Sequence, residues 1–472
     1  MEQEQQKMGF WLLTALVVGN MGGSGIFMLP RTLAAVASPL GVLLAWSFTA
    51  LGVLMLALVY GNLSLRKPDI TGGPQIYAKE LFQNKRRSLL GGFLVTWGYW
   101  VADFIGVVAM LITFTSYLSA IFPILSSKEI IWSLGSFDLY LGNFLSFLIA
   151  SLLLWLITFT IWRGMETAGK VNFIATLTKV LGFLFFIVVA IYSFDASYFF
   201  PLDQPRYNDA GEVVSVFGQV NHAAISTLWA FAGIESAVVF SDRAKRKSDI
   251  RKATITGLFI TTILYVGITL LVMGTMPQSQ LIVSEKPLAD AMYNVVGSAG
   301  SSIIAILGCI AIVGTTIGWV MISAEVPYQA AKNGMFIEKF AKENRRKAPV
   351  FSLFLSCSLS QLFLFSAISQ SMAQVFDFIV FVSILTYLLP LGMGPIYQLK
   401  LVISGETYEK DKRARTIDGI ISFIAAIYFT WLVLTGTSDM KGFILGICLI
   451  LSAFIFYPLL KLPPKENQQR SK

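Results

Sequence analysis

The sequence predicts an all-α integral membrane protein with twelve transmembrane helices. Of the 472 residues, 55% are hydrophobic and only 13% are charged, which is about half the charged share of an average soluble domain. The apolar residues are concentrated in runs of about 20 residues, the length that crosses the hydrocarbon core of a bilayer. The twelve runs lie at residues 9–37, 41–65, 93–121, 139–161, 169–193, 221–240, 254–276, 301–326, 350–368, 373–397, 416–436 and 440–460.

The basic residues predict which ends of these helices face the cytoplasm. If the N-terminus is cytoplasmic, nearly all of the 36 Lys and Arg residues fall in the inner connections and the C-terminal tail. Cytoplasmic loops carry an excess of Lys and Arg, so both termini are expected to be cytoplasmic. This bias also explains the formal net charge of +9, and no nucleic-acid partner is expected.

The first run is interrupted by glycine. Residues 19–25 read Gly-Asn-Met-Gly-Gly-Ser-Gly, and each glycine costs about 1 kcal/mol relative to alanine inside a helix. Backbone groups freed by a break are costly in hydrocarbon unless a partner satisfies them, so the break is expected to line a cavity for a polar ligand. A half-helix after Ser24 would direct its N–H groups and its positive dipole end at an anion such as a carboxylate.

The sixth run has a weaker interruption at Gly233, followed by Glu235 and Ser236. The first and sixth runs each begin a set of five. Interrupted helices at corresponding positions of two halves indicate a midplane binding site in an inverted-repeat transporter. The alternative is that these glycines only let membrane helices pack closely.

The sequence argues against an enzyme, a metalloprotein and a channel. The chain has three cysteines without a CxxC pair and one histidine, so no disulfide framework, metal site or cofactor is expected. An enzyme would need a reactive cluster of side chains, and a channel would need a repeated filter or a ring of charge. Neither pattern occurs, so a secondary transporter is expected.

Several stretches resemble signatures of the amino acid–polyamine–organocation superfamily. Those at the two interruptions resemble the family's first and sixth spans, and two later stretches are similar to its basic amino acid antiporters. The four lie at residues 19–27 with 29–30, 228–237, 325–336 with 348–350, and 397–400. The resemblance covers nearly the whole chain and implies a LeuT-like fold. Two inverted repeats of five helices, about 9–193 and 221–397, would form a transport core at 1–397, and 398–472 would add two helices and a cytoplasmic tail.

The resemblance also implies how the substrate is held at the two interruptions. Ser24 and Gly25 match positions whose hydroxyl and amide groups bind the substrate carboxylate. Met21, Trp229 and Ala232 match positions whose backbone carbonyl groups receive the substrate amine.

Aromatic residues are expected to cover the substrate. Trp229 and Trp319 match the family's stacking residues, and a cation over an indole ring gains about 0.5–2 kcal/mol. Tyr99 is expected in the same substrate-binding set. The alternative is that the two tryptophans, out of ten in the chain, only fill the core.

Asp103, in the third run, departs from the family pattern. The arginine/agmatine exchanger that the chain resembles has a small neutral residue there, and an amide side chain where this chain has Val107. A desolvated pair of Arg and carboxylate is bidentate and strong. Asp103 is therefore expected to bind the distal cation of the substrate and to disfavour neutral substrates. The alternative is that Asp103 pairs with a helix backbone or with Lys179.

Lys179 and Glu235 are also expected at membrane depth, where an ionisable side chain is a functional hypothesis by default. The resemblance implies that Lys179 occupies the space of a sodium ion used by relatives, and that Glu235 takes part in proton-dependent gating. The alternatives are a lysine that snorkels to the membrane surface and a carboxyl group that binds backbone.

The predicted function is exchange of cationic amino acids, arginine for ornithine, agmatine or lysine, by alternating access. The alternative is a proton-coupled symporter that takes up a cationic amino acid, which Lys179 supports. The expected surroundings are the lipid bilayer of a bacterial plasma (inner) membrane, and a homodimer is left open.

Overall fold

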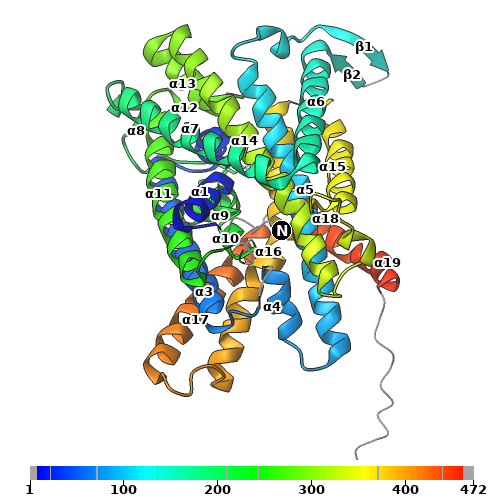
Figure 1. The fold of residues 1–472 in the computed structure, drawn as a ribbon. Coiled ribbons are helices and arrows are strands. Elements are labelled where there is room, and N and C mark those ends of the chain that lie inside the picture. Colours follow the sequence, from blue (N-terminus) through cyan, green and yellow to red (C-terminus); the bar gives the residue numbers. More distant parts are fainter. Residues whose placement is uncertain are drawn as a thin grey trace, which may run out of the picture.

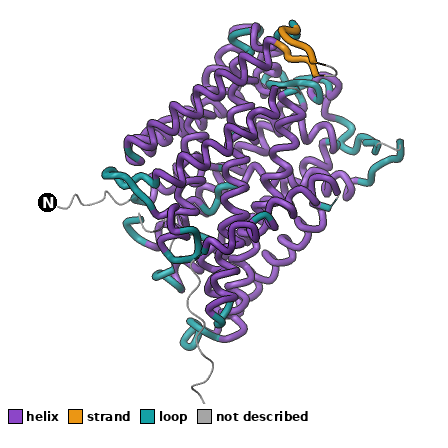
Figure 2. The backbone as a smooth tube through the Cα atoms, turned by 90° about the vertical axis from the view of Figure 1, so that its right-hand side faces the viewer, coloured by secondary structure: helices purple, strands orange, loops and turns teal. Residues whose placement is uncertain are grey.

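The computed structural model is a bundle of long helices with one short β-hairpin (Figures 1 and 2). It describes residues 8–21, 23–70, 73–134, 137–208, 211–239, 241, 244–368, 371–437 and 440–460. The predicted hydrophobic runs coincide with these helices, so the helical membrane class is confirmed.

Within the described residues, nine helical segments are long and apolar enough to cross a membrane. They are α3 (Pro39–Arg66), α5 (Lys85–Leu118), α6 (Leu141–Arg163), α7 (Met165–Ile191), α11 (Lys247–Met273), α14 (Ser298–Lys332), α16 (Met372–Ser404), α17 (Lys412–Gly436) and the segment Met440–Leu459, which begins with α18 (Met440–Leu451). A tenth span is formed by α1 (Phe10–Asn20) and α2 (Gly25–Val36), which meet at a bend of 41°. The other two predicted runs fall on the shorter helices α9 (Val216–Phe231) and α15 (Val350–Leu364), so the count of twelve stays a prediction.

Short elements mark the two ends of the bundle (Figure 1). One end, called the basic end below, carries α4 (Pro74–Glu80) and the connection between α16 and α17. The opposite end carries the antiparallel hairpin of β1 (Ile130–Leu134) and β2 (Phe137–Tyr140), together with α8 (Ala196–Phe199), α12 (Gln278–Leu281) and α13 (Pro287–Val296). The remaining short elements are α10 (Ser236–Val239), α19 (Ala453–Phe456), η1 (Pro123–Ser126), η3 (Glu338–Ala341), η4 (Phe365–Ile368) and η5 (Tyr457–Leu459).

The centre of the bundle is built on α5, α14 and α16. In the most apolar stretch of 18 residues, 89% of the residues are buried in α5, 72% in α14 and 78% in α16, whereas only 28% are buried in α17. The first three helices therefore face protein on nearly every side, whereas most of α17 faces outward. The last core helix, α16, continues to Ser404, beyond the predicted core boundary at residue 397, and the division into two repeats stays a prediction.

Candidate functional site

The first predicted run breaks where its glycines indicate. Helix α1 ends at Asn20, and α2 begins at Gly25 with Ser24 as its N-cap. A Cβ atom on Gly23 would lie 2.1 Å from Cγ2 of Thr315, so only glycine fits against α14 at this point. Gly22 lies outside the described residues.

The sixth run breaks as well, between Phe231 of α9 and Ser236 of α10. Gly233 lies in this break with a φ of 97°, a backbone conformation that residues with a Cβ atom rarely adopt. A Cβ there would also lie 3.0 Å from the carbonyl oxygen of Asn20. The Asn20 amide donates from Nδ2 to Oγ of Ser236 over 2.9 Å, so the two breaks touch each other.

The two helices that enter the breaks end in the same way. Met21 caps α1 with φ and ψ of −64° and 134°, and Ala232 caps α9 with −59° and 133°. This extended conformation turns the chain out of the helix, so the carbonyl groups of the last helical turn have no intrahelical donors. The two helix ends share this backbone geometry, and the correspondence of the two halves stays a prediction.

Lys179 binds the carbonyl groups that the first break frees. Its Nζ donates to the carbonyl oxygens of Val18 (2.7 Å), Gly19 (3.1 Å) and Met21 (3.2 Å). An ammonium group has three donors and no acceptor, so it suits a cluster of carbonyl oxygens. With 3% of its surface exposed, the side chain does not snorkel to the membrane surface.

Three further side chains, from α14 and α11, donate to carbonyl groups of the same break: Thr315 Oγ1 to Gly19 (3.0 Å), Trp319 Nε1 to Asn20 (3.0 Å) and the Tyr265 hydroxyl to Met21 (2.6 Å). Sequence reasoning missed Thr315 and Tyr265. The Met21 carbonyl therefore has donors for both of its lone pairs, and a substrate amine would have to displace one of them.

One face of α5 runs along both breaks. Tyr99, Asp103, Gly106 and Met110 follow one another at spacings of three or four residues, so they share this face of the helix. All four are buried. Tyr99 faces Glu235 in the second break, and Met110 faces the start of α2. Asp103 and Gly106 lie between them on the helix.

The start of α2 lies against Met110. The backbone N–H of Ser24 points to the Met110 sulfur, with 3.0 Å between nitrogen and Sδ. A thioether is a weak acceptor, so this N–H remains suited to a stronger acceptor such as a carboxylate. The Ser24 hydroxyl is buried and has no hydrogen-bond partner among the described residues.

The predicted tryptophans form a pair beside the breaks. The ring centroids of Trp229 and Trp319 lie 5.0 Å apart with the rings tilted by 50°. A Cβ on Gly106 would lie 2.4 Å from Cζ3 of Trp319 and 3.1 Å from Cη2 of Trp229, and a Cβ on Gly25 would lie 3.0 Å from Cδ1 of Trp229. Two glycines, one on α5 and one on α2, therefore make room for the indoles.

Asp103 is buried next to this pair, one turn before Gly106. Only 3% of its surface is exposed, and its Oδ2 has no hydrogen-bond partner in the part of the chain that the structure describes. None of the ion pairs between described residues joins Asp103 to Lys179, and a bond to a helix backbone stays the other alternative.

Glu235, in the second break, is held by two tyrosines. The hydroxyl groups of Tyr99 and Tyr387 donate to its Oε1 and Oε2, and only 2% of its surface is exposed. Tyr99 was in the predicted site, whereas Tyr387 on α16 was not. The carboxylate thus connects the second break to both α5 and α16.

Contacts between distant segments close both ends of this site. At the opposite end, Arg31 of α2 forms an ion pair with Asp377 of α16. At the basic end, the rings of Tyr77 and Tyr397 stack at 5.6 Å, and Lys400 donates over 2.6 Å to a carbonyl group at the end of α4. The breaks therefore lie in a closed interior. Across the described residues, no group of three His, Cys, Asp or Glu side chains could hold a metal ion.

Comparison with known proteins identifies the family. The family model of amino acid permeases matches residues 8–462. The chain belongs to the amino acid permease family. This permease is 46% identical, over 99% of its own length and all of the relative, to a putative arginine/ornithine antiporter of Bacillus subtilis (strain 168).

Two more distant relatives carry similar names. The permease is 33% identical to an arginine/ornithine antiporter of Pseudomonas aeruginosa, over 97% of its length and 90% of the relative. It is 30% identical to an arginine/agmatine antiporter of Chlamydia trachomatis, over 91% of its length and 85% of the relative. These matches confirm the resemblance to basic amino acid antiporters.

Proposed function

We propose that this permease exchanges cationic amino acids, arginine for ornithine, agmatine or lysine, by alternating access. One observation carries the choice of a cationic substrate: Asp103 is buried and one of its oxygens lacks a partner among the described residues. The names of the antiporters among its relatives support the same substrate class.

A buried carboxylate selects for charge because an ion removed from water costs several kcal/mol unless it is paired. The guanidinium group of arginine or the ammonium group of ornithine would supply charge-assisted hydrogen bonds to Asp103. A neutral side chain would leave this carboxylate unpaired. Discrimination against neutral amino acids therefore follows from the site without a steric barrier.

The length of the site suits these substrates. Met110 of α5, which contacts Ser24 at the start of α2, follows Asp103 by seven residues, which corresponds to a rise of about 10.5 Å along α5. In extended arginine, six bonds span roughly 7–8 Å between the carboxylate and guanidinium carbons, and each terminal hydrogen bond adds about 2.8 Å. Ornithine is one bond shorter and still covers the distance.

The α-carboxylate would bind at the start of α2. In our proposal it displaces the Met110 sulfur from the Ser24 N–H and takes a second hydrogen bond from the Ser24 hydroxyl, with Gly25 giving access to the helix end. An anion at this position also benefits from the dipole of α2. The buried Ser24 hydroxyl without a partner among the described residues supports this role.

The rest of the site would hold the substrate's amine and aliphatic chain. The amine would bind carbonyl groups of Met21, Trp229 and Ala232, after Tyr265 or Lys179 releases the Met21 carbonyl. The indoles of Trp229 and Trp319 would cover the aliphatic chain. Their contacts with Gly25 and Gly106 support this arrangement.

Two ionisable groups would couple binding to conformation. Lys179 would keep the first break in shape, as its three carbonyl contacts support. Glu235, bound by Tyr99 and Tyr387, would respond to protons or to substrate and alter the contact between α5 and α16. In bacteria we expect the basic end to face the cytoplasm of a plasma (inner) membrane, and a homodimer stays an expectation.

Counterflow into proteoliposomes tests the exchange. Vesicles that hold the purified permease and unlabelled ornithine should take up labelled arginine, whereas empty vesicles should not. An imposed proton gradient should not replace internal ornithine. Uptake into empty vesicles that requires the proton gradient would instead favour the symporter.

Citrulline tests the role of Asp103, because it has the shape of arginine with a neutral urea group. Loss of a hydrogen bond to a charged group costs about 1.5–3 kcal/mol, so Asp103→Asn should weaken arginine competition by roughly 10- to 100-fold. Citrulline should compete poorly with the wild type and lose much less in the variant. Asp103→Glu, which keeps the charge, is the control. Unchanged arginine exchange in Asp103→Asn would refute this role.

A further inference from the structure

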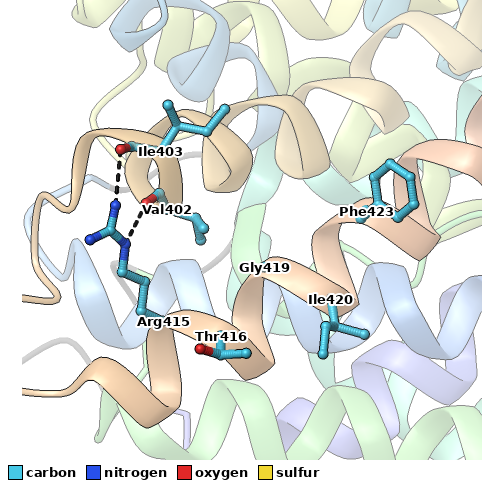
Figure 3. A pocket seen from close by; sticks show the side chains of 7 residues that line it. All are labelled: Val402, Ile403, Arg415, Thr416, Gly419, Ile420 and Phe423. Atoms are coloured by element: carbon cyan, nitrogen blue, oxygen red, sulfur yellow. Dashed lines mark hydrogen bonds between the residues drawn. The ribbon is translucent and has the colours of Figure 1, made fainter.

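A groove on the outward side of the bundle lies between the end of α16 and the start of α17 (Figure 3). Its walls are mostly apolar and include Val402 and Ile403 of α16 and Gly419, Ile420 and Phe423 of α17, with Arg415 at one end. We propose that this groove binds one anionic phospholipid of the bilayer, with its phosphate at Arg415 and one acyl chain along α17.

Arg415 is fixed at the mouth of the groove. Its Nε donates to the carbonyl of Val402 over 2.7 Å, and its Nη2 donates to the carbonyl of Ile403 over 3.0 Å. These carbonyl groups belong to the last turn of α16, which lacks intrahelical donors and attracts a cation. The two bonds use two of the five N–H groups of a guanidinium, and the others suit a phosphate, which arginine binds in a bidentate manner.

The charge around the mouth favours an anion. Residues 405–415 hold four basic and three acidic side chains. One acidic group, Glu406, is paired with Lys67, so four basic groups face two acidic groups, one of which, Asp411, caps the start of α17. Lys412 is exposed and lies one turn before Thr416, so it is on the groove's face of α17. Together with Arg415 it gives the mouth two cations.

The length of the groove along α17 is close to the thickness of one leaflet of the hydrocarbon core. From Arg415 to Phe423 the rise along α17 is about 12 Å, close to half of a hydrocarbon core of about 30 Å. Ile420 and Phe423 are 56% and 61% exposed, as expected for a wall that meets an acyl chain. Gly419 forms the floor, where a Cβ would lie 3.1 Å from a methyl carbon of Val402. The site thus combines a cationic head region with a chain-length apolar channel.

Native mass spectrometry of the purified full-length permease tests the head region. Phosphatidylglycerol and phosphatidylcholine with identical acyl chains are added separately, and retained lipid is counted. The wild type should retain one phosphatidylglycerol in preference to phosphatidylcholine. Arg415→Gln should weaken this binding about fivefold, the factor that corresponds to about 1 kcal/mol per basic residue at a membrane surface. Arg345→Gln removes the same charge from another exposed arginine, which lies outside the groove, and should bind as the wild type does.

A second pair of variants tests the apolar channel. Gly419→Leu fills the floor and should lower retention of phosphatidylglycerol at least fivefold, whereas Gly267→Leu, on α11 and away from the groove, should not. Equal losses in Arg415→Gln and Arg345→Gln would overturn the proposal, and so would unchanged binding in Gly419→Leu. Cross-linking of the Ile420→Cys or Phe423→Cys variant into a lipid-free dimer would also overturn it, because a second copy would then occupy the groove.

Discussion

Replacement of Lys179 by methionine removes charge from the first break while keeping most of the side-chain volume. Three hydrogen bonds to backbone carbonyl groups are lost. The carbonyls of Gly19 and Met21 each keep a second donor, from α14 and α11 respectively, so the Val18 carbonyl is the group most affected. One buried group without a partner costs about 1–3 kcal/mol. Removal of a buried ammonium group offsets part of this cost.

The expected loss of stability is therefore small, a few kcal/mol at most, whereas the expected loss of exchange is large. Without the ammonium group, no other hydrogen bond from the described side chains of α7 reaches the carbonyls around Met21, where the substrate amine would bind. We expect arginine–ornithine exchange in proteoliposomes to fall at least tenfold. Each 1.4 kcal/mol of binding free energy lost through misplaced carbonyl groups corresponds to a factor of ten. Thermal unfolding of the same preparations should show a folded protein.

The control for this experiment is Lys67→Met, which removes a lysine that pairs with Glu406 at the basic end. Exposed ion pairs contribute about 0–1 kcal/mol, so this variant should exchange substrate at nearly the wild-type rate. If Lys179→Met also exchanged at the wild-type rate, the carbonyl contacts would be incidental to transport. If it did not fold, Lys179 would be a structural requirement and the magnitude given above would be wrong.

Two further predictions concern the indole pair and the closure at the opposite end. Gly106→Ala should reduce initial exchange rates at least tenfold because its Cβ would lie 2.4 Å from Trp319, whereas Gly267→Ala, whose Cβ has no atom nearer than 3.7 Å, should leave them unchanged. Reversal of either charge in the pair of Arg31 and Asp377 should slow exchange by placing like charges together, and the double reversal should recover it; equal rates for single and double variants would contradict this.

The fold class and both breaks could be predicted from sequence because their physical causes are local. A bilayer cannot satisfy polar backbone groups, so each crossing segment must be helical and apolar over its whole length. Glycine-rich interruptions are then conspicuous, and Gly23 and Gly233 are each required by a close contact in the structure. Intramembrane charges such as Lys179 are conspicuous for the same reason.

The partners of these features could not be predicted, because they come from distant parts of the chain. Tyr387 binds Glu235 from 152 positions away, and nothing local distinguishes it among 16 tyrosines. Thr315 and Tyr265 were missed for the same reason. Tertiary packing decides which hydroxyl groups face a break, and one sequence contains no direct record of that packing.

Helix α16 connects the features that would have to change during transport. Asp377 pairs with Arg31 near its start, Tyr387 binds Glu235 in its middle, and Tyr397 stacks on Tyr77 near its end. Pro390 and Pro395 lie between the last two contacts, and each removes a helical hydrogen bond. Kinks in helices are commonly found at such residues. The part of α16 that closes the basic end can therefore bend while the part that holds Asp377 stays in place, which is what alternating closure of the two ends requires.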